Sequence, residues 1–184
     1  MVTKVASVDA SKVPALEELD TPNTPTIDSL VAVLNEKFGG GYTGASTLKN
    51  VMLMADNKAI SVLVPGDREV DLKRLQAGLP GVEELRTFEE ADFAKFPTLI
   101  KGYIGPQDAA KSGITIYADP RVAPGTSWVT GANKKDRHAR NVVNGRDFTP
   151  FAYVEAAEIR EGDSCPECAT AVVIDRAIEI GHIF

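Results

Sequence analysis

Two neighbouring apolar runs constrain the fold of this chain more than any other feature of its sequence. The runs LKNVMLMA (residues 48–55) and AISVLV (59–64) are partly β-branched, as residues of strands are. Asp56-Asn57-Lys58, which separates them, is typical of a tight turn. The sequence therefore predicts a β-hairpin, and it places Lys49 in the first strand of that hairpin.

Helices are expected on both sides of the hairpin. The apolar residues of segment 27–38 recur at helical spacing, Thr26 or Asp28 can cap its start, and Gly39-Gly40-Gly41 ends it. Two shorter helical stretches follow at VDLKRLQAGL (70–79) and FEEADFAKF (88–96). The second opens with acidic residues, which are favoured at a helix start.

Further strands are predicted in the C-terminal half. Four segments have strand character: ITIYAD (114–119), SWVTGA (127–132), NVVN (141–144) and AVVIDRAIEI (171–180). Together with the helices, they predict a mixed α/β domain. Residues 1–25 are polar and proline-containing, so we expect them to form a leader or linker, with the folded domain spanning 26–184.

Composition limits the class of protein. With 184 residues, 43% of them hydrophobic, the chain is long enough for one domain with a sizeable core. No apolar run approaches the ~18 residues needed to cross a bilayer, and the first residues have no stretch that resembles a signal peptide. We therefore expect a cytoplasmic protein with no membrane contact.

Charge is distributed unevenly along the chain. The formal net charge of −6 argues against a protein that coats nucleic acid. Segment 134–146 nevertheless sums to +4, with five basic residues against the single Asp136. This basic segment suits contact with a few phosphates, such as the end of an RNA strand. A solvated charged loop explains the composition at least as well.

The residues that usually carry catalysis or bind metal are few. Cys165-Pro166-Glu167-Cys168 offers two thiolates, and only His138 and His182 remain to complete a zinc site that needs four ligands. A turn with two free cysteines is the better interpretation. Nucleophile-elbow and phosphate-loop motifs are also missing from the sequence. Residue types alone therefore indicate an α/β domain with a basic edge and no more.

Eight short segments carry further information through their order. They are Thr47-Leu48-Lys49, Pro65-Gly66-Asp67-Arg68-Glu69, Gly102-Tyr103-Ile104-Gly105-Pro106, Asp119-Pro120-Arg121-Val122, Gly131-Ala132-Asn133, His138, Gly145-Arg146-Asp147 and residues 176–184, RAIEIGHIF. In order and approximate spacing, the series resembles the editing domain inserted in bacterial prolyl-tRNA synthetases. The resemblance covers roughly residues 21 to 184.

The resemblance implies a fold and an activity. The family fold is a mixed, barrel-like β-sheet flanked by helices, shared with free-standing deacylases that clear mischarged tRNA in trans. The implied activity is hydrolysis of alanyl-tRNA(Pro), because a synthetic site built for proline gains only ~1–3 kcal/mol of discrimination against the smaller alanine. A second, smaller pocket in the editing domain then hydrolyses the alanyl ester that the synthetic site has formed.

The resemblance also implies partners. They are the acceptor end of tRNA(Pro) carrying alanine and the body of the parent synthetase, into which segment 176–184 would lead. An excised domain would accordingly stop on apolar residues, as this chain does at Phe184. No cofactor is expected for the editing domain, and ATP and magnesium would be needed only by the parent synthetase.

Catalytic roles follow by match to the family pattern for Lys49, Gly102, Gly105 and Pro106. Lys49 matches the lysine that holds the phosphate and ester end of the aminoacyl-adenosine. The glycines of the GxxxP loop let backbone N–H groups approach the scissile carbonyl and stabilise the oxyanion. A surface lysine and a plain turn are the alternatives on residue type alone.

Substrate-binding roles are implied for Asp119, Gly131, Asn133 and His138. These residues match positions that line or support the pocket, and His138 is associated with the limit on side-chain size. A structural histidine is the usual alternative. The family resemblance also implies that the 2′-hydroxyl of the terminal adenosine activates the attacking water.

The sequence departs from the family pattern at two places. Ala139 to Asn144 replace a run that commonly holds aromatic residues and an Asn-Trp pair, and Asn50 stands where threonine is usual. Two rival functions therefore stay open beside cis editing. One is a free-standing trans-editing deacylase, and the other is a non-catalytic tRNA-binding module.

Overall fold

The predicted hairpin is the central element of the fold. In the computed structural model, which describes residues 7–165, 167–178 and 181, strands β2 (Leu48–Ala55) and β3 (Lys58–Pro65) pair antiparallel along their whole length. Asp56 in the turn has a φ of 51°, a left-handed conformation that aspartate tolerates better than most residues. The hairpin prediction is confirmed.

A five-stranded mixed sheet is built on this hairpin. Strand β4 (Leu85–Thr87) pairs antiparallel with β2, while β5 (Thr115–Ala118) and β8 (Ala152–Tyr153) continue the sheet beyond β3 in parallel. The resulting strand order is β4-β2-β3-β5-β8. Parallel pairing of β3 with β5 requires a long crossover, which holds the helices between residues 72 and 112.

A second, three-stranded antiparallel sheet lies beside the first. It has the order β1-β7-β6, formed by β1 (Glu17–Asp20), β7 (Arg137–Val143) and β6 (Ser127–Gly131). A bridge from Thr47 to Val129 links the two sheets. The mixed α/β class is confirmed. Within the described residues the two sheets do not close into a barrel, so the expected term 'barrel-like' describes them only loosely.

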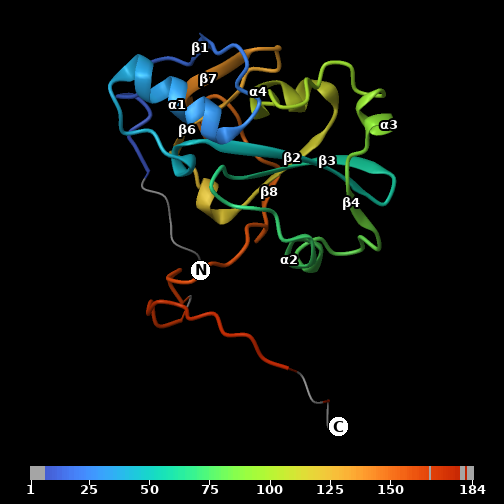
Figure 1. The fold of residues 1–184 in the computed structure, drawn as a ribbon. Helices are drawn as coiled ribbons and strands as arrows, with labels where there is room; N and C mark the ends of the chain where they lie inside the picture. Colours follow the sequence, from blue (N-terminus) through green and yellow to red (C-terminus); the bar gives the residue numbers. More distant parts are fainter. Residues whose placement is uncertain (1–6, 166, 179–180, 182–184) are drawn as a thin grey trace.

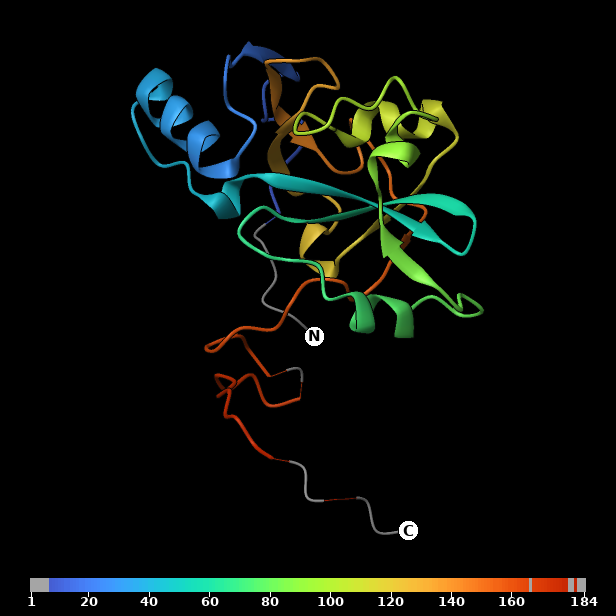
Figure 2. The same cartoon turned by 45° about the vertical axis from the view of Figure 1, so that its right-hand side comes forward.

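Helix α1 (Ile27–Phe38) covers the three-stranded sheet. Thr26 caps it by accepting a hydrogen bond from the Ser29 amide, and Gly39 ends it with a φ of 80°. Its buried residues Leu30 and Leu34 pack with Val129. Figures 1 and 2 show α1 and this sheet at one end of the β2–β3 hairpin, with β4 near the other end.

The remaining helices are short and lie mostly in the crossover. They are α2 (Leu72–Ala77), α3 (Glu90–Phe93), α4 (Pro106–Ala109) and the 3-10 turns η1 (Gly44–Ser46), η2 (Ala110–Ser112) and η3 (Pro120–Val122). The helices expected at 70–79 and 88–96 thus form, although each is shorter than predicted.

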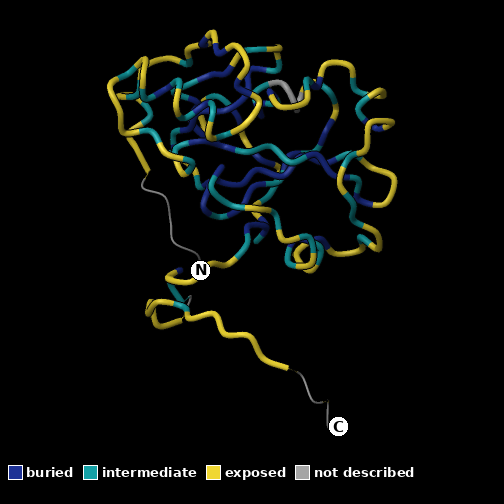
Figure 3. The backbone as a smooth tube through the Cα atoms, viewed as in Figure 1, coloured by how far each residue is buried: buried dark blue, intermediate teal, exposed yellow. Residues whose placement is uncertain are grey.

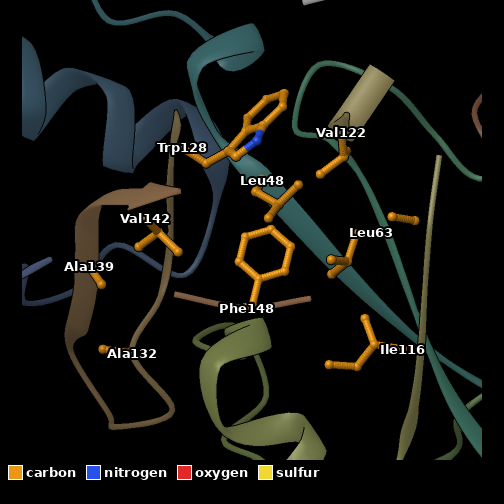
Figure 4. Packing of buried hydrophobic residues seen from close by; sticks show 10 residues of the cluster. Leu48, Leu63, Ile116, Val122, Trp128, Ala132, Ala139, Val142 and Phe148 are labelled. Carbon is orange, nitrogen blue, oxygen red and sulfur yellow. The ribbon is translucent and has the colours of Figure 1, made fainter. Parts of the chain in front are cut away.

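The main core joins residues of both sheets. Leu48 of β2 and Leu63 of β3 pack with Trp128 of β6 and Val142 of β7, and Phe148 lies among them (Figure 4). The indole N–H of Trp128 donates to the Thr126 hydroxyl at 2.6 Å, so the buried ring leaves no polar atom without a partner. This shared core fixes the two sheets to each other and therefore fixes the space between them.

The first strand lies inside the expected leader. β1 pairs with β7, more than 100 residues further along the chain, and Leu19 is buried beneath α1. Residues 17–20 are therefore structural, although their composition is polar, because an edge strand needs only one apolar face. The domain boundary expected at residue 26 itself stays a prediction.

The strand expected at 171–180 does not form over the residues that the structure describes there. Ala171 bridges Ser164, but residues 172–178 have no strand partner, and Val173 and Ile178 are largely exposed. The tail runs away from the body, and nearly all of it is exposed (Figures 1 and 3). Apolar character predicted a strand, but a strand also needs a neighbour. Residues 179 and 180 lie outside the described part.

Across the described residues, no helix combines the length and apolar character that a membrane crossing demands.

Candidate active site

A cavity of about 670 Å³ lies beside the first residues of β2. Its walls come from the start of α1, the residues just before β2, the segment after β3 with Asp67 and Glu69, the loop that contains Gly102 and Ile104, the end of β6, and one residue of β7. The volume is in the range of pockets that bind small molecules. Of the eight predicted site residues, Lys49, Gly102, Gly131 and His138 line it.

Lys49 reaches the cavity from the second position of β2. Its ammonium forms an ion pair with the Glu69 carboxylate, with Nζ and Oε1 2.6 Å apart. The lysine side chain is 23% exposed, whereas that of Glu69 is 73% exposed. The next residue, Asn50, donates to the Ile104 carbonyl and to the Thr130 hydroxyl, both at 3.1 Å, and so ties β2 to the neighbouring loop and to β6.

The glycine loop is fixed by close backbone packing against β6. A Cβ on Gly131 would lie 2.1 Å from the Tyr103 carbonyl, and a Cβ on Gly105 would lie 1.9 Å from the Gly131 oxygen. Only glycine allows such an approach. Asn133 completes the contact, since its side chain accepts from the Gly105 amide at 2.9 Å and donates to the Gly105 carbonyl at 3.2 Å. Gly105 and Asn133 therefore support the loop from outside the cavity.

The loop retains two backbone donors for a ligand. The amides of Tyr103 and Gly105 already donate, to the Ile100 carbonyl and to Asn133. Pro106 has no N–H and starts α4. The amides of Gly102 and Ile104 have no acceptor among the described residues, and both residues line the cavity. Within this loop, these two amides are therefore the backbone donors that a ligand could still use.

His138 forms part of the cavity wall at its buried end. It is 5% exposed, its Nδ1 lies 2.8 Å from the Thr21 hydroxyl, and its ring centroid is 5.3 Å from that of Tyr103. Burial lowers its pKa to about 4, so the ring is neutral at pH 7. The Tyr103 hydroxyl donates to Asp136 at 2.9 Å, which fixes the ring beside it. Thr21 fell within the expected leader and was therefore missed.

Asp119 is not among the residues that line the cavity, and its predicted role in substrate binding stays a prediction. Its carboxylate is fully buried and accepts from the amides of Ala156 and Ala157 at 3.0 and 2.8 Å. It also forms an ion pair with Arg121. A carboxylate with this many internal partners anchors the segment after β8 and has little capacity left for a ligand.

A buried charge network connects that anchor to the cavity. Asp163 pairs with Arg121 and, through two bonds of 2.7 and 2.8 Å, with Arg68. The hydrogen bonds from Arg68 lower the Asp163 pKa to about 2. Arg68 stands between Asp67 and Glu69, two acidic residues that line the cavity. Their segment was recognised in the sequence, but nothing there assigned either side chain a role.

The basic segment 134–146 is largely neutralised by internal partners. Lys134 pairs with Glu18, Arg140 with Glu17, and Arg146 with Asp147, at distances of 2.7 to 2.9 Å. Two of these acids lie on β1, which pairs with β7. The structure thus favours a paired charged edge over an open phosphate site.

Neither cysteine forms a disulfide in the structure. Cys165 is half-buried and Cys168 is exposed. Within the described residues, no group of three or more His, Cys, Asp or Glu side chains is placed to hold a metal ion. His182 lies outside the described part of the chain, and the expectation of a metal-free protein stays a prediction.

This fold and cavity have counterparts among known proteins. Residues 21–148 match the family of aminoacyl-tRNA editing domains, and the chain belongs to that family. A crystal structure of a candidate trans-editing enzyme for prolyl tRNA synthetase superposes with a TM-score of 0.56 at 13% identity, covering 78% of this chain and 87% of the other. A hypothetical protein gives a TM-score of 0.60 at 14% identity, with 78% and 92% covered. At such identities these two structures support the fold alone.

Curated relatives are more similar in sequence. The proline–tRNA ligase of Streptomyces coelicolor is 50% identical over 182 residues, which cover 98% of this chain and 30% of the ligase. That of Corynebacterium efficiens is 49% identical, with 90% and 30% covered. The chain thus spans about 30% of the length of these relatives.

Proposed function

We propose that this chain is the editing part of a proline–tRNA ligase and that it hydrolyses the ester bond of alanyl-tRNA(Pro), in the cytoplasm. The observation that carries the proposal is that Lys49, Gly102, Ile104 and the neutral His138 line one cavity. The sequence relatives support the choice of tRNA, since those compared are proline–tRNA ligases.

Each part of the cavity has a distinct chemical task. Lys49 binds the phosphate and ester end of the terminal adenosine, and the amides of Gly102 and Ile104 receive the oxyanion. One such donor contributes about 3 kcal/mol to lowering the barrier. His138 and the wall around it limit the size of the amino acid. These residues position and stabilise, and none of them supplies a nucleophile.

Water is the nucleophile in this mechanism. Its oxygen attacks the carbonyl carbon while the 2′-hydroxyl of the substrate takes its proton and passes one to the 3′-oxygen as the ester bond breaks. Free alanine and an uncharged tRNA result. His138 is a poor base for this task because a group with a pKa of about 4 holds a proton weakly.

A substrate that lacks the 2′-hydroxyl tests this step. With the ester on the 3′-oxygen and hydrogen at the 2′-position, hydrolysis should fall close to the uncatalysed rate while binding is largely kept. Normal cleavage of the deoxy substrate would place the base on the protein, and His138 would be the first residue to mutate.

Deacylation assays test the function as a whole. Alanyl-, cysteinyl- and prolyl-tRNA(Pro) are incubated with the chain in the presence of a chelator, and release of the amino acid is followed. We expect release of alanine, with prolyl-tRNA spared and no need for metal. Failure to release any amino acid would favour a non-catalytic tRNA-binding module.

A free-standing trans-editing deacylase is the second candidate. A candidate trans-editing enzyme for prolyl tRNA synthetase has the same fold, so the fold is compatible with this arrangement as well as with editing in cis. The open reading frame around this segment discriminates the two, because flanking aminoacylation motifs require editing in cis.

A further inference from the structure

The charged residues that line the cavity are mostly acidic. Asp28, Asp67 and Glu69 face it together with Lys49, and His138 is neutral at pH 7. A pocket that served only the phosphate and ester end of a nucleotide would repel its ligand with such a lining. The acidic residues therefore indicate that the ligand also carries a positive charge.

The backbone of Glu69 is fixed by hydrogen bonds to Glu158, and these bonds do not involve the Glu69 carboxylate. Its amide donates to the Glu158 carboxylate at 3.1 Å, and its carbonyl accepts from the Glu158 amide at 2.9 Å. The preceding Arg68 is fixed by its two bonds to Asp163. The Glu69 side chain is 73% exposed and has Lys49 as its ion-pair partner. A rigid backbone thus presents a carboxylate whose partner can be exchanged.

Glu69 differs in this respect from the other two acidic residues. Asp67 lies 3.9 Å from the Arg68 guanidinium, which the substrate does not approach in the proposed function. Asp28 lies in the first turn of α1, where the helix dipole stabilises a negative charge without a cation. Only Glu69, among the described acidic residues of the cavity lining, shares a cation that the substrate would claim.

We propose that the Glu69 carboxylate binds the α-ammonium group of the aminoacyl ester. The inference rests on the proposed function, in which Lys49 turns to the phosphate and ester end of the substrate. Glu69 then loses its cation, and the substrate supplies another in the same cavity. Each charge remains paired, so the exchange avoids an uncompensated carboxylate beside the ester.

This assignment makes Glu69 a specificity-determining residue. The ligand class becomes esters of α-amino acids with a free ammonium group. Esters whose nitrogen is acylated, as in peptidyl-tRNA, lack the charge and are disfavoured. The domain would therefore remove a single misplaced amino acid while sparing a growing peptide.

Lactyl-tRNA tests the inference because lactate replaces the ammonium of alanine by a hydroxyl of similar size. We compare kcat/KM for alanyl- and lactyl-tRNA, each divided by its uncatalysed rate, in the wild-type chain, in Glu69→Gln and in Asp28→Asn. The wild type should prefer alanyl-tRNA roughly tenfold or more, as expected for a charged hydrogen bond. Glu69→Gln should lose most of this preference, whereas Asp28→Asn, a matched change in the same cavity, should keep it.

Two results would overturn the proposal. A wild type with no preference would show that the ammonium is not recognised, and a Glu69→Gln variant with the full preference would assign its recognition to another group. Absence of alanyl-tRNA hydrolysis by the wild type is a different outcome, because it would remove the proposed function itself and the inference with it.

Discussion

Lys49 has a backbone fixed in a strand and a side-chain ammonium whose ion-pair partner can be exchanged. Its strand pairs with β3 on one side, and the Leu48 carbonyl just before it accepts from Thr130. Among the described residues, its ammonium is paired with the exposed Glu69 carboxylate alone. An exposed ion pair of this kind contributes at most ~1 kcal/mol to stability. The side chain can therefore be removed without unfolding the chain.

Lys49→Ala should lower kcat/KM for alanyl-tRNA by about 10²-fold or more, because the ester end loses the charge that positions it. Circular dichroism should show an unchanged fold. Lys58→Ala is the matched control, since Lys58 lies at the other end of the same hairpin. Full activity in Lys49→Ala would remove the lysine from the site.

His138 should make the stability of the chain depend on pH in a defined window. Its pKa falls from 6.5 in the unfolded chain to about 4 in the folded one because the ring is buried. Below pH 6.5 the unfolded chain binds the extra proton first, so stability decreases as pH falls toward 4. Between pH 7 and 4.5 we expect a loss of about 2–3 kcal/mol in the free energy of unfolding.

Urea unfolding of wild type and His138→Gln at both pH values measures this loss. The variant should show a much flatter dependence, whatever its absolute stability. Asp92 and Asp163 also have lowered pKa values, but their effects fall below pH 3.8, outside the window. Equal slopes in the two proteins would mean that His138 titrates normally.

The sequence located some site residues better than others. Lys49 and His138 were assigned by resemblance, and both line the cavity. Asp119 belongs to an equally recognisable segment, yet its carboxylate points to backbone amides. A motif fixes residue type and order, whereas the direction of a side chain depends on segments that pack against it later in the chain. For the same reason Glu69 received no role, whereas Thr21 received none because it lies in the segment expected to be a leader.

At the scale of elements, the contact between the glycine loop and β6 decides whether the site forms. Gly131→Ala would place a methyl group 2.1 Å from the Tyr103 carbonyl, and the backbone cannot yield without moving the loop. We expect a loss of about 1–3 kcal/mol of stability, as for overpacking in general. Activity should fall at least tenfold in the fraction that remains folded, because the Gly102 and Ile104 amides move with the loop.

Gly81→Ala is the control for that substitution. Gly81 has a φ of 83° but open space around its Cβ position, so alanine there should cost about 1 kcal/mol and leave activity unchanged. Thermal unfolding and single-turnover deacylation, measured on both variants, separate the two effects. Full activity in Gly131→Ala would show that the loop does not depend on this contact.

Elements stabilised by nearby residues were predicted more accurately than those stabilised by distant ones. Helix α1 and the β2–β3 hairpin carry their own caps and turn, so residues within a few positions define them. β1 was missed because its partner, β7, lies more than 100 residues away. The prediction of a strand at 171–180 was wrong for the opposite reason. The segment has the apolar pattern of a strand, but the described residues offer it no partner strand.

At the scale of the whole molecule, acidic residues form ion pairs with the basic edge of this acidic chain. The net charge is −6, and two cations of this edge, Arg140 of β7 and Lys134 of the turn before it, are paired with Glu17 and Glu18 of β1. A cation already paired releases fewer counterions on contact with a phosphate. The chain alone should therefore bind tRNA weakly and with little dependence on salt.

The double substitution Glu17→Gln and Glu18→Gln tests this arrangement by freeing Arg140 and Lys134 without adding a cation. Fluorescence anisotropy with labelled tRNA should show tighter binding, and the slope of log K against log salt should steepen by about one to two. Glu83→Gln with Glu84→Gln is the matched control, because it changes the net charge equally but lies in the loop before β4. If only the pairs on β1 matter, the control stays close to wild type. An equal gain in both variants would mean that tRNA responds to total charge alone, and the paired edge would then have no special part in binding.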